Sequence, residues 1–296
     1  MMPATSYPIL ELRPESSERF ESLGSKPKFW FRMEEVGKPW LFKFARPGTG
    51  EDWAEKISAE LAELLGLPHA TIELATFMDK RGSASPTFVP DDADLIHCNE
   101  ILAGHILGYD AAKKFGQNDH TFGRIVTAFY NIFPEGQERN EALTMLAGYL
   151  TLDAMIGNVD RHHENWAVLR SASTETPSLR IAPTFDHASS LGRELRDEKR
   201  KDFLRQKRIA DYVQKGSGAI YWKETDPKGA NPLALAIRAA KTHRSYFQRW
   251  IDRIKDVAPA ELHLLISKVP EHWMSPIAKE FAVAILSHTT AHLKTL

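Results

Sequence analysis

The sequence predicts an α+β fold in which a small strand-rich lobe precedes a larger helical lobe. Short aromatic-rich runs at Phe29–Met33 and Trp40–Phe44 are typical of strands. Helical spacing of apolar residues dominates the later part of the chain, and the pattern changes near residue 95. We therefore expect one lobe over residues 1–95 and a second over residues 96–296, with a ligand site in the cleft between them.

The first lobe is predicted to contain a hairpin and a helix. Residues 34–39 would join the two aromatic runs as the turn of the hairpin. Apolar residues then repeat at helical spacing over residues 54–65, where Thr49 or Asp52 can cap the start and Gly66 can end the helix. The remaining elements expected in this lobe are a strand over residues 70–78 and a turn over residues 81–86.

The second lobe is predicted to be mainly helical. Residues 141–156 carry apolar side chains on one helical face. Asn231 and Ser275 each precede a proline, a pattern that marks a helix N-cap followed by its first helical position. Helices of roughly 15–20 residues are expected after each of these pairs. Two short strands, over residues 166–169 and before Asp186, are predicted to form a second hairpin.

Composition narrows the class of protein. Apolar residues make up 43% and charged residues 26% of the chain, as in ordinary globular proteins. The net charge of −1 gives no basic excess that would indicate direct binding to nucleic acid. The apolar runs are far shorter than the ~18 residues of a membrane span, and no secretory signal pattern begins the chain. One cysteine, Cys98, excludes an intramolecular disulfide. We expect a cytoplasmic enzyme without membrane attachment.

The densest cluster of reactive side chains lies in GNVDRHHENWAVLR, residues 157–170. Asp160 and Asn165 stand five residues apart in this segment, and Asp186 follows the next predicted strand. Phosphoryl transfer needs a carboxylate that orients and deprotonates the acceptor hydroxyl, and oxygen ligands that hold Mg²⁺ against the phosphates. This pattern supplies one base and two ligands, while His162 or His163 would orient the loop.

Two other interpretations of this cluster stay open. Asn158, Asp160 and Asn165 could form a simple polar turn, because such side chains bond readily to the local backbone. A transition metal for hydrolysis is the second alternative, with ligands from Asp160, His162, His163, Asp186 and His187. Adjacent histidines project poorly onto one ion, however, and no HExxH helix accompanies them.

A kinase would also need a lysine, a glutamate and a phosphate-covering loop in the first lobe. Lys43 ends the apolar run of the second aromatic strand, where its cation could pair with phosphates. Glu55 and Glu60 lie on opposite sides of the following helix, so periodicity alone does not choose between them. The segment ESLGSK, residues 21–26, precedes the first aromatic strand and is the better candidate for the loop, although no GxxxxGK[ST] or GxGxxG pattern is present.

These residues resemble the HipA-like serine/threonine kinases of bacterial type II toxin–antitoxin systems. The segments MIGNVDRHHENWAVL and IAPTFDHASSLG carry the resemblance by their order and spacing. SLGSKPKFWF, WLFKF and EKISAELAELLGLP support it, and the similarity covers most of the chain. Phosphatidylinositol kinases share a similar DRHxxN loop, but the AELAELLGLP helix and the APTFDHAS segment favour the HipA-like family.

The resemblance implies a two-lobed, protein-kinase-like fold that uses ATP and Mg²⁺. Asp160 would be the catalytic base, and Asn165 and Asp186 would be the metal ligands. Lys43 would hold the phosphates, and Glu55 is preferred over Glu60 as its partner on the helix. The remaining residues implied at the nucleotide are Ser22, Gly24, Ser25, Lys26, Lys28 and His162.

Family members can carry an autophosphorylated serine in the phosphate-covering loop. Glu21 aligns near that position, with Ser22 and Ser25 beside it, so autophosphorylation at either serine is a hypothesis. The chain begins almost at this loop and resembles the compact form, which lacks the N-terminal subdomain of longer members. The family also implies a DNA-binding antitoxin, a small separate protein that resembles the N-terminal subdomain, and a protein substrate such as an aminoacyl-tRNA synthetase.

Two other functions remain as alternatives. The same loop would serve a small-molecule or lipid kinase, and a non-catalytic nucleotide-binding module is the third possibility. The complete set of Lys43, Asp160, Asn165 and Asp186 argues against a non-catalytic module. The basic stretch Arg193–Arg208 could meet an acidic partner, but a solvated helix with paired charges is favoured.

Overall fold

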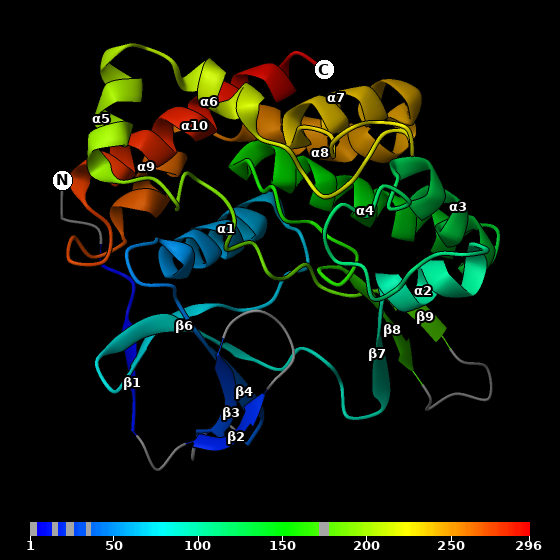
Figure 1. Cartoon of the computed structure of the whole chain (residues 1–296), viewed down its shortest axis with the longest axis horizontal. Coiled ribbons are helices and arrows are strands. Elements are labelled where there is room, and N and C mark those ends of the chain that lie inside the picture. Colours follow the sequence, from blue (N-terminus) through cyan, green and yellow to red (C-terminus); the bar gives the residue numbers. More distant parts are fainter. Residues whose placement is uncertain (1–4, 14–16, 22–26, 34–36, 172–177) are drawn as a thin grey trace.

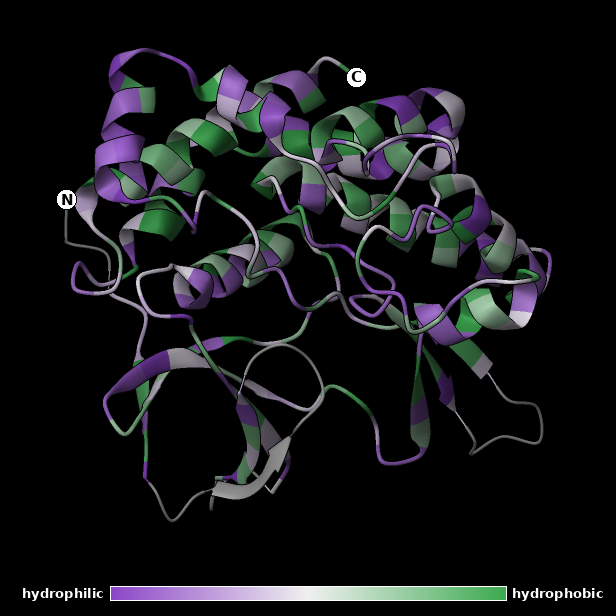
Figure 2. Cartoon of the chain, viewed as in Figure 1, coloured by the Kyte–Doolittle hydropathy of each residue, from purple (hydrophilic) through white to green (hydrophobic). Residues whose placement is uncertain are grey.

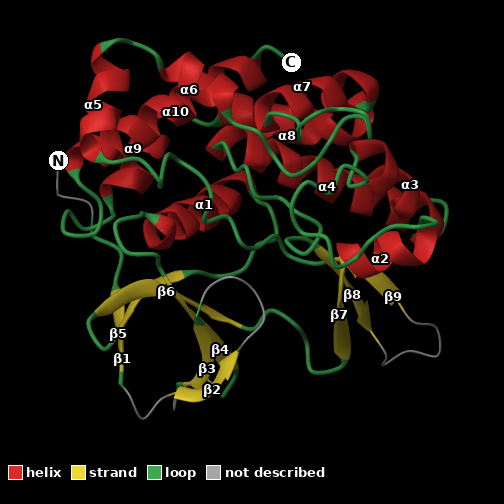
Figure 3. Cartoon of the chain, in the orientation of Figure 1, coloured by secondary structure: helices red, strands yellow, loops and turns green. Residues whose placement is uncertain are grey.

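The computed structural model describes residues 5–13, 17–21, 27–33, 37–171 and 178–296. Strands gather on one side of the molecule and most helices on the other (Figure 3). This arrangement confirms the predicted α+β class, with a strand-rich first part and a larger helical second part. The elements of the first part are β1 (Ile9–Leu12), β2 (Ser17–Glu21), β3 (Lys28–Arg32), β4 (Pro39–Phe44), α1 (Glu51–Leu65), β5 (Glu73–Phe77) and β6 (Lys80–Pro86).

The strands of the first part form one mixed sheet in the spatial order β1-β5-β6-β4-β3-β2. β1 and β5 run parallel, and the other neighbours are antiparallel. The hairpin predicted from the aromatic runs is confirmed, because β3 pairs with β4 with Phe29 opposite Phe42. Both rings are buried in an aromatic cluster that also includes Phe31 and Phe77. Burial of these large rings holds the sheet together.

The turn predicted over residues 81–86 is wrong, because these residues form most of β6. β6 lies inside the sheet between β5 and β4. A Cβ atom on Gly82 would come within 2.2 Å of the Lys43 carbonyl oxygen, so the close approach of the strands requires glycine there. The turn lies just before, at Met78 and Asp79, which both have positive φ angles. The small residues around Gly82 therefore allow two strands to pack closely, and they do not form a turn.

Helix α1 is confirmed, but its predicted cap is wrong. The N-cap residue is Gly50, which has no side chain, so no side-chain hydrogen bond caps the start of the helix. Asp52 lies in the first turn, where its carboxylate accepts a 2.8 Å hydrogen bond from Arg81 on β6. Gly66 ends the helix as predicted, with φ of 70° and its N–H directed at the last carbonyls. Figure 1 shows α1 between the large sheet and the other helices.

A three-stranded sheet and a helical layer make up the second part. β8 pairs antiparallel with both β7 and β9, which confirms the hairpin predicted before Asp186. The elements are β7 (Ala93–His97), α2 (Cys98–His105), α3 (Phe122–Ile132), α4 (Gln137–Ile156), β8 (Ala167–Ser171), β9 (Ser178–Ile181), α5 (Asp197–Arg205), α6 (Ile209–Lys215), α7 (Pro232–Thr242), α8 (Arg244–Asp256), α9 (Pro259–Ser267) and α10 (Pro276–Lys294).

The two predicted helix starts at proline are confirmed by their caps. Asn231 accepts a hydrogen bond from the Ala234 N–H at the start of α7, and Ser275 accepts one from the Ala278 N–H at the start of α10. The length predicted for α7 is wrong, because the helix ends at Thr242 after 11 residues. A second helix, α8, begins directly afterwards, so one continuous helical pattern in the sequence corresponds to two helices.

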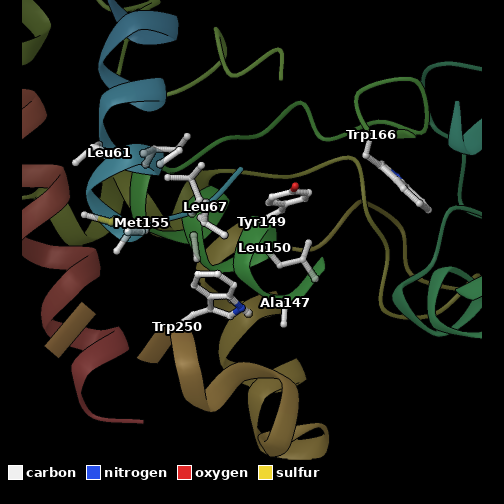
Figure 4. Packing of buried hydrophobic residues seen from close by; sticks show 14 of the residues in the cluster. Leu61, Leu67, Ala147, Tyr149, Leu150, Met155, Trp166 and Trp250 are labelled. Atoms are coloured by element: carbon white, nitrogen blue, oxygen red, sulfur yellow. The ribbon is translucent and has the colours of Figure 1, made fainter. Parts of the chain in front are cut away.

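Helix α4 runs through the middle of the helical part and leads into the predicted catalytic loop. It contacts α1, α3, α7, α8 and α10, and most of its residues are buried (Figure 4). A Cβ atom on Gly148 would lie 2.5 Å from Leu67 and 2.6 Å from Trp250, so glycine permits this close packing. Apolar residues line the inner surfaces of the helices, whereas α5 is mostly hydrophilic (Figure 2). Among the described residues, no helix combines the length and apolarity needed for a membrane crossing.

Candidate active site

The loop after α4 is held in shape by its own polar side chains. Gly157 ends the helix with φ of 66°, and Asn158 then donates a 2.8 Å hydrogen bond back to Asp153. The side-chain oxygen of Asn158 accepts from the Asp160 N–H at 3.1 Å. Asn165 closes the loop, because its Nδ2 donates to the Asp160 carbonyl at 2.7 Å. That bond uses the amide nitrogen, so Oδ1 is the Asn165 atom suited to a metal ion.

A buried ion pair anchors this loop to α4. Arg161 Nε lies 2.7 Å from Asp153 Oδ2, and Nη2 lies 2.8 Å from Oδ1, with both side chains about 5% exposed or less. Nη1 of Arg161 also donates to the Asn165 carbonyl at 2.6 Å and to the Phe185 carbonyl at 3.4 Å. Burial opposes the charge, but the Asp153 carboxylate outweighs it and raises the pKa of Arg161. One charged guanidinium therefore fixes both predicted metal-binding segments.

Asp186 stands at the meeting point of the two parts of the molecule. Its φ angle of 59° is in the left-handed region, which is uncommon for a residue other than glycine and is often found at functional sites. Asp186 Oδ2 lies 3.5 Å from Nζ of Lys43, which comes from β4 of the large sheet. Both side chains are partly exposed, at 35% and 24%. The structure thus brings the predicted lysine and the predicted metal ligand together.

The register of the large sheet adds Lys28 to this region. Lys28 on β3 is directly opposite Lys43 on β4, so the two side chains are on the same face of the sheet. The loop predicted to cover the phosphates precedes Lys28. Its residues Ser22, Gly24, Ser25 and Lys26 lie outside the described residues.

The two glutamates of α1 have different surroundings. Glu55 is buried, and its Oε1 accepts a 2.9 Å hydrogen bond from the backbone N–H of His187, next to Asp186. Glu60 instead forms an ion pair with Lys56 at 2.9 Å. Burial, followed by the charge of Arg161, lowers the pKa of His187, so this ring stays neutral beside Glu55. Glu55 is therefore the glutamate that contacts the segment carrying Asp186.

The histidines of the loop have different partners. His162 accepts a hydrogen bond from the Glu164 N–H at 3.2 Å, within the loop itself. His163 points into the core, where its Nδ1 is 2.7 Å from the Tyr109 hydroxyl. Burial, followed by the charge on His162, lowers the pKa of His163 to about 4. Within the described ranges, no group of three or more His, Cys, Asp or Glu side chains is arranged to hold a metal ion.

A separate cavity of about 730 Å³ lies at the N-terminal end of α1. Its walls include Phe44, Trp53, Arg81, Arg200 and Trp273, from both parts of the molecule. Lys43, Asp160 and Asp186 are not among its lining residues. The cavity is therefore distinct from the residues predicted to bind the nucleotide.

Several contributors to this site were not identified from the sequence. Asp153 was counted only as part of an apolar helix, although a buried acid one turn before a polar loop could have indicated an anchor. Arg161 stood inside the motif without an assigned role. Ser189 Oγ lies 3.4 Å from Asp160 Oδ2, and Arg193 Nη2 donates to the same hydroxyl at 3.2 Å. Their placement depends on tertiary contacts that no local pattern reveals.

Comparisons with known proteins show the family and the fold of the chain. The family model described as the HipA-like C-terminal domain matches residues 21–269. The chain belongs to this HipA-like family. The match includes β3, β4, α1, the loop after α4 and the segment carrying Asp186. A comparison with curated proteins finds no similar sequence.

Two solved structures show the same fold. The Helicobacter pylori proinflammatory kinase CtkA is similar with a TM-score of 0.77 at 19% identity, over 97% of this chain and 98% of that chain. HipA of Shewanella oneidensis MR-1, determined with HipB and operator DNA, gives a TM-score of 0.54 at 16% identity. That match covers 94% of this chain and 67% of the HipA chain. The chain therefore has the HipA-like, kinase-like fold.

Proposed function

We propose that this HipA-like chain is an ATP-dependent protein serine/threonine kinase. The observation that carries the proposal is the 3.5 Å approach of Lys43 to Asp186 beside the loop that holds Asp160 and Asn165. A strand lysine, two oxygen ligands and a carboxylate that can act as a base are the parts that phosphoryl transfer requires. The polar-turn interpretation does not account for a lysine from a different sheet at the same place.

Asp160 is assigned as the catalytic base. Its carboxylate is half-buried and lies at the start of a loop whose backbone is fixed by Asn158 and Asn165. A base must be held in one orientation to accept the proton of an acceptor hydroxyl. The buried anchor through Arg161 supplies that rigidity.

Asn165 and Asp186 are assigned as ligands for Mg²⁺. Carboxylate and amide oxygens suit this hard ion, and Arg161 ties the backbones of both segments to one point. Bound Mg²⁺ would neutralise negative charge on the phosphate oxygens of ATP. The unusual backbone conformation of Asp186 directs its carboxylate toward Lys43.

Lys43 is assigned to the α- and β-phosphates, with Lys28 on the same face of the sheet. Glu55 holds the segment that carries Asp186, and His162 lies in the loop beside Asp160. Ser22, Gly24, Ser25 and Lys26 are proposed to cover the phosphates through backbone N–H groups. Phosphorylation at Ser22 or Ser25 would regulate this loop.

An aromatic pair is suitably placed for the adenine base. Phe185 directly precedes Asp186, and its ring stacks on Phe88 with a centroid separation of 5.6 Å. Both rings pack against an apolar cluster on β8 that includes Ala167 and Leu169. A planar base would bind against such a surface through dispersion and stacking. Phe88→Ala is expected to raise the KM for ATP about tenfold with a smaller change in kcat.

The biological role follows from the family. We propose that the kinase inhibits growth by phosphorylating a cellular protein in the cytoplasm, with an aminoacyl-tRNA synthetase as the first substrate to test. The Shewanella HipA was determined in complex with HipB and operator DNA, which supports a DNA-binding antitoxin as a partner. A small separate protein resembling the N-terminal subdomain is the second partner to test. Contact with DNA would then be made by the antitoxin.

Incubation with γ-labelled ATP and Mg²⁺ in a bacterial lysate tests the function. The wild-type chain is expected to label a protein on serine or threonine, and Asp160→Gln is expected to bind ATP without transferring phosphate. Label confined to lipids or small metabolites would support the alternative of a lipid or small-molecule kinase. Equal labelling by the Asp160→Gln variant would reject the assigned base, and no transfer by the wild type would reject the enzyme.

A further inference from the structure

The segment that follows Asp186 is held between α1 and the predicted catalytic loop. On one side, the His187 N–H donates to Glu55 at 2.9 Å and the Ser190 hydroxyl lies 3.2 Å from the Ser58 hydroxyl. On the other side, the Val159 N–H donates to the Ser189 carbonyl at 3.2 Å. The segment therefore contacts both parts of the molecule within a few residues.

The Ser189 hydroxyl lies beside the proposed base. Its Oγ lies 3.4 Å from Oδ2 of Asp160, within reach of a long hydrogen bond to that carboxylate. The same hydroxyl accepts a 3.2 Å hydrogen bond from Nη2 of Arg193. A hydroxyl that receives one hydrogen bond is free to donate its own proton to the carboxylate. Asp160 is thereby held from its side chain as well as from its backbone.

Arg193 continues this chain of contacts to the start of α1. Its Nη1 lies 3.0 Å from Oε1 of Glu51, a carboxylate that is 3% exposed. The Arg193 carbonyl also accepts a 2.9 Å hydrogen bond from the Gly50 N–H, at the N-cap of the helix. Because one planar guanidinium bonds to both Glu51 and Ser189, the placement of α1 determines the placement of the hydroxyl.

We propose that Ser189 and Arg193 are positioning residues, which hold the Asp160 carboxylate and couple its orientation to the first turn of α1. The coupling relay is defined as Glu51, Arg193, Ser189 and Asp160. It rests on the proposed function, since Asp160 must be the base for its orientation to affect turnover. It also implies that displacement of the first turn of α1 lowers the rate of transfer without removing any group that contacts ATP.

Steady-state kinetics of three single variants test the relay. Ser189→Ala is expected to lower kcat roughly 10- to 100-fold, since it removes one hydrogen bond to a charged group. The KM for ATP is expected to stay within about twofold, because Ser189 is assigned no contact with the nucleotide. Ser189→Thr keeps the hydroxyl and should recover most of the activity. Arg193→Lys keeps the charge but cannot bridge two partners with a planar fork, so its kcat should fall as well.

The link to α1 is tested by a double variant with a matched control. Glu51→Gln is expected to lower kcat several-fold, whereas Glu63→Gln, an exposed glutamate on the same helix, should leave it unchanged. If Glu51 acts through Arg193 and Ser189, the double variant Glu51→Gln/Ser189→Ala should be no slower than Ser189→Ala alone. Fully multiplicative losses in the double variant would overturn the coupling.

Four results separate failure of this inference from failure of the proposed function. An inactive wild type would reject the kinase itself. An active wild type with an equally active Ser189→Ala variant would overturn only the positioning role. Phosphate found by mass spectrometry on Ser189 of the ATP-treated wild type would identify the hydroxyl as an acceptor and would also overturn that role. An equal loss of kcat in Ser189→Ala and Ser189→Thr would show that the hydroxyl alone does not preserve the rate. That result would also overturn the positioning role.

Discussion

The helical side and the strand side of the candidate site are held in different ways. On the helical side, Arg161 and Asp153 form a buried, bidentate ion pair that fixes the loop of Asp160 to the central helix α4. On the strand side, Lys43 approaches Asp186 at 3.5 Å and both side chains are partly exposed. The segments that carry the proposed base and metal ligands are thus anchored by a buried ion pair, whereas the proposed phosphate-binding Lys43 contacts Asp186 through a partly exposed ion pair, a kind that contributes little to stability.

The largest expected effect comes from removing the buried ion pair on the helical side. Asp153→Ala leaves the Arg161 guanidinium buried without its carboxylate, which typically costs about 3–5 kcal/mol. Urea unfolding at neutral pH should show this loss of stability, together with loss of phosphoryl transfer. As a control, Asp202→Ala removes the exposed partner of Arg205 and should change the unfolding free energy by less than about 0.5 kcal/mol. A stability loss in Asp153→Ala no larger than in the control would contradict the anchor.

The next effect separates activity from stability on the strand side. Lys43→Met is expected to lower kcat/KM by about 10²- to 10³-fold, because a charge that stabilises phosphate is removed. The unfolding free energy should change by less than about 1 kcal/mol, since the contact with Asp186 is partly exposed. Kinetics and urea unfolding of the same preparation provide both values. A stability loss as large as that of Asp153→Ala would remove the distinction between the two sides.

The pattern of residues predicted the helical side better than the strand side. Asp160, Asn165 and Asp186 could be found because a loop and the end of a short hairpin keep them close in sequence. Lys43 could be proposed as a phosphate-binding residue, but its contact with Asp186 could not be predicted. That contact depends on how two separate sheets meet. The choice of Glu55 over Glu60 came from the resemblance, because helical periodicity places them on opposite sides and gives neither a partner.

The elements missed by sequence analysis share one physical cause. β6 appeared to be a turn because Gly82 and its small neighbours suit turns as well as close strand packing. The cap of α1 was misplaced because Asp52 lies inside the first turn, where its carboxylate accepts hydrogen bonds from the Trp53 N–H and from Arg81 on β6. The relay residues Ser189 and Arg193 lie in a segment without periodicity. In each case a contact distant in sequence outweighs the local preference.

A smaller effect concerns the dependence of stability on pH. His120 is buried beside His163 and Trp166, it accepts a hydrogen bond from Trp166, and burial lowers its pKa to about 3. An unfolded chain would protonate this histidine near pH 6.5, so the unfolded state binds more protons between these values. The contribution of neutral, buried His120 to the free energy of unfolding is therefore complete above pH 6.5. As the pH falls from 6.5 toward 3, this contribution should decrease by about 1.4 kcal/mol per pH unit.

Urea unfolding between pH 5 and pH 7 measures this dependence. His120→Gln keeps a polar side chain that cannot be protonated, so its stability should fall less steeply with acidification than that of the wild type. Identical slopes for the wild type and His120→Gln would show that His120 does not titrate with unfolding.

The smallest expected effect concerns the basic stretch over residues 193–208. Arg200 is buried and donates hydrogen bonds to Asp197 and to the Gly192 carbonyl. It therefore holds the backbone next to Arg193 in place. Arg205 and Arg208 are exposed and pair with neighbouring acids at intervals of three residues, as expected for a solvated helix.

The triple variant Arg205→Ser/Lys207→Ser/Arg208→Ser tests whether this exposed surface contacts the substrate. Its unfolding free energy should stay within about 1 kcal/mol of the wild type, because each exposed pair contributes little. Labelling of the protein target in a lysate should also be unchanged. A selective loss of target labelling, with ATP binding and stability intact, would instead assign these side chains to substrate recognition.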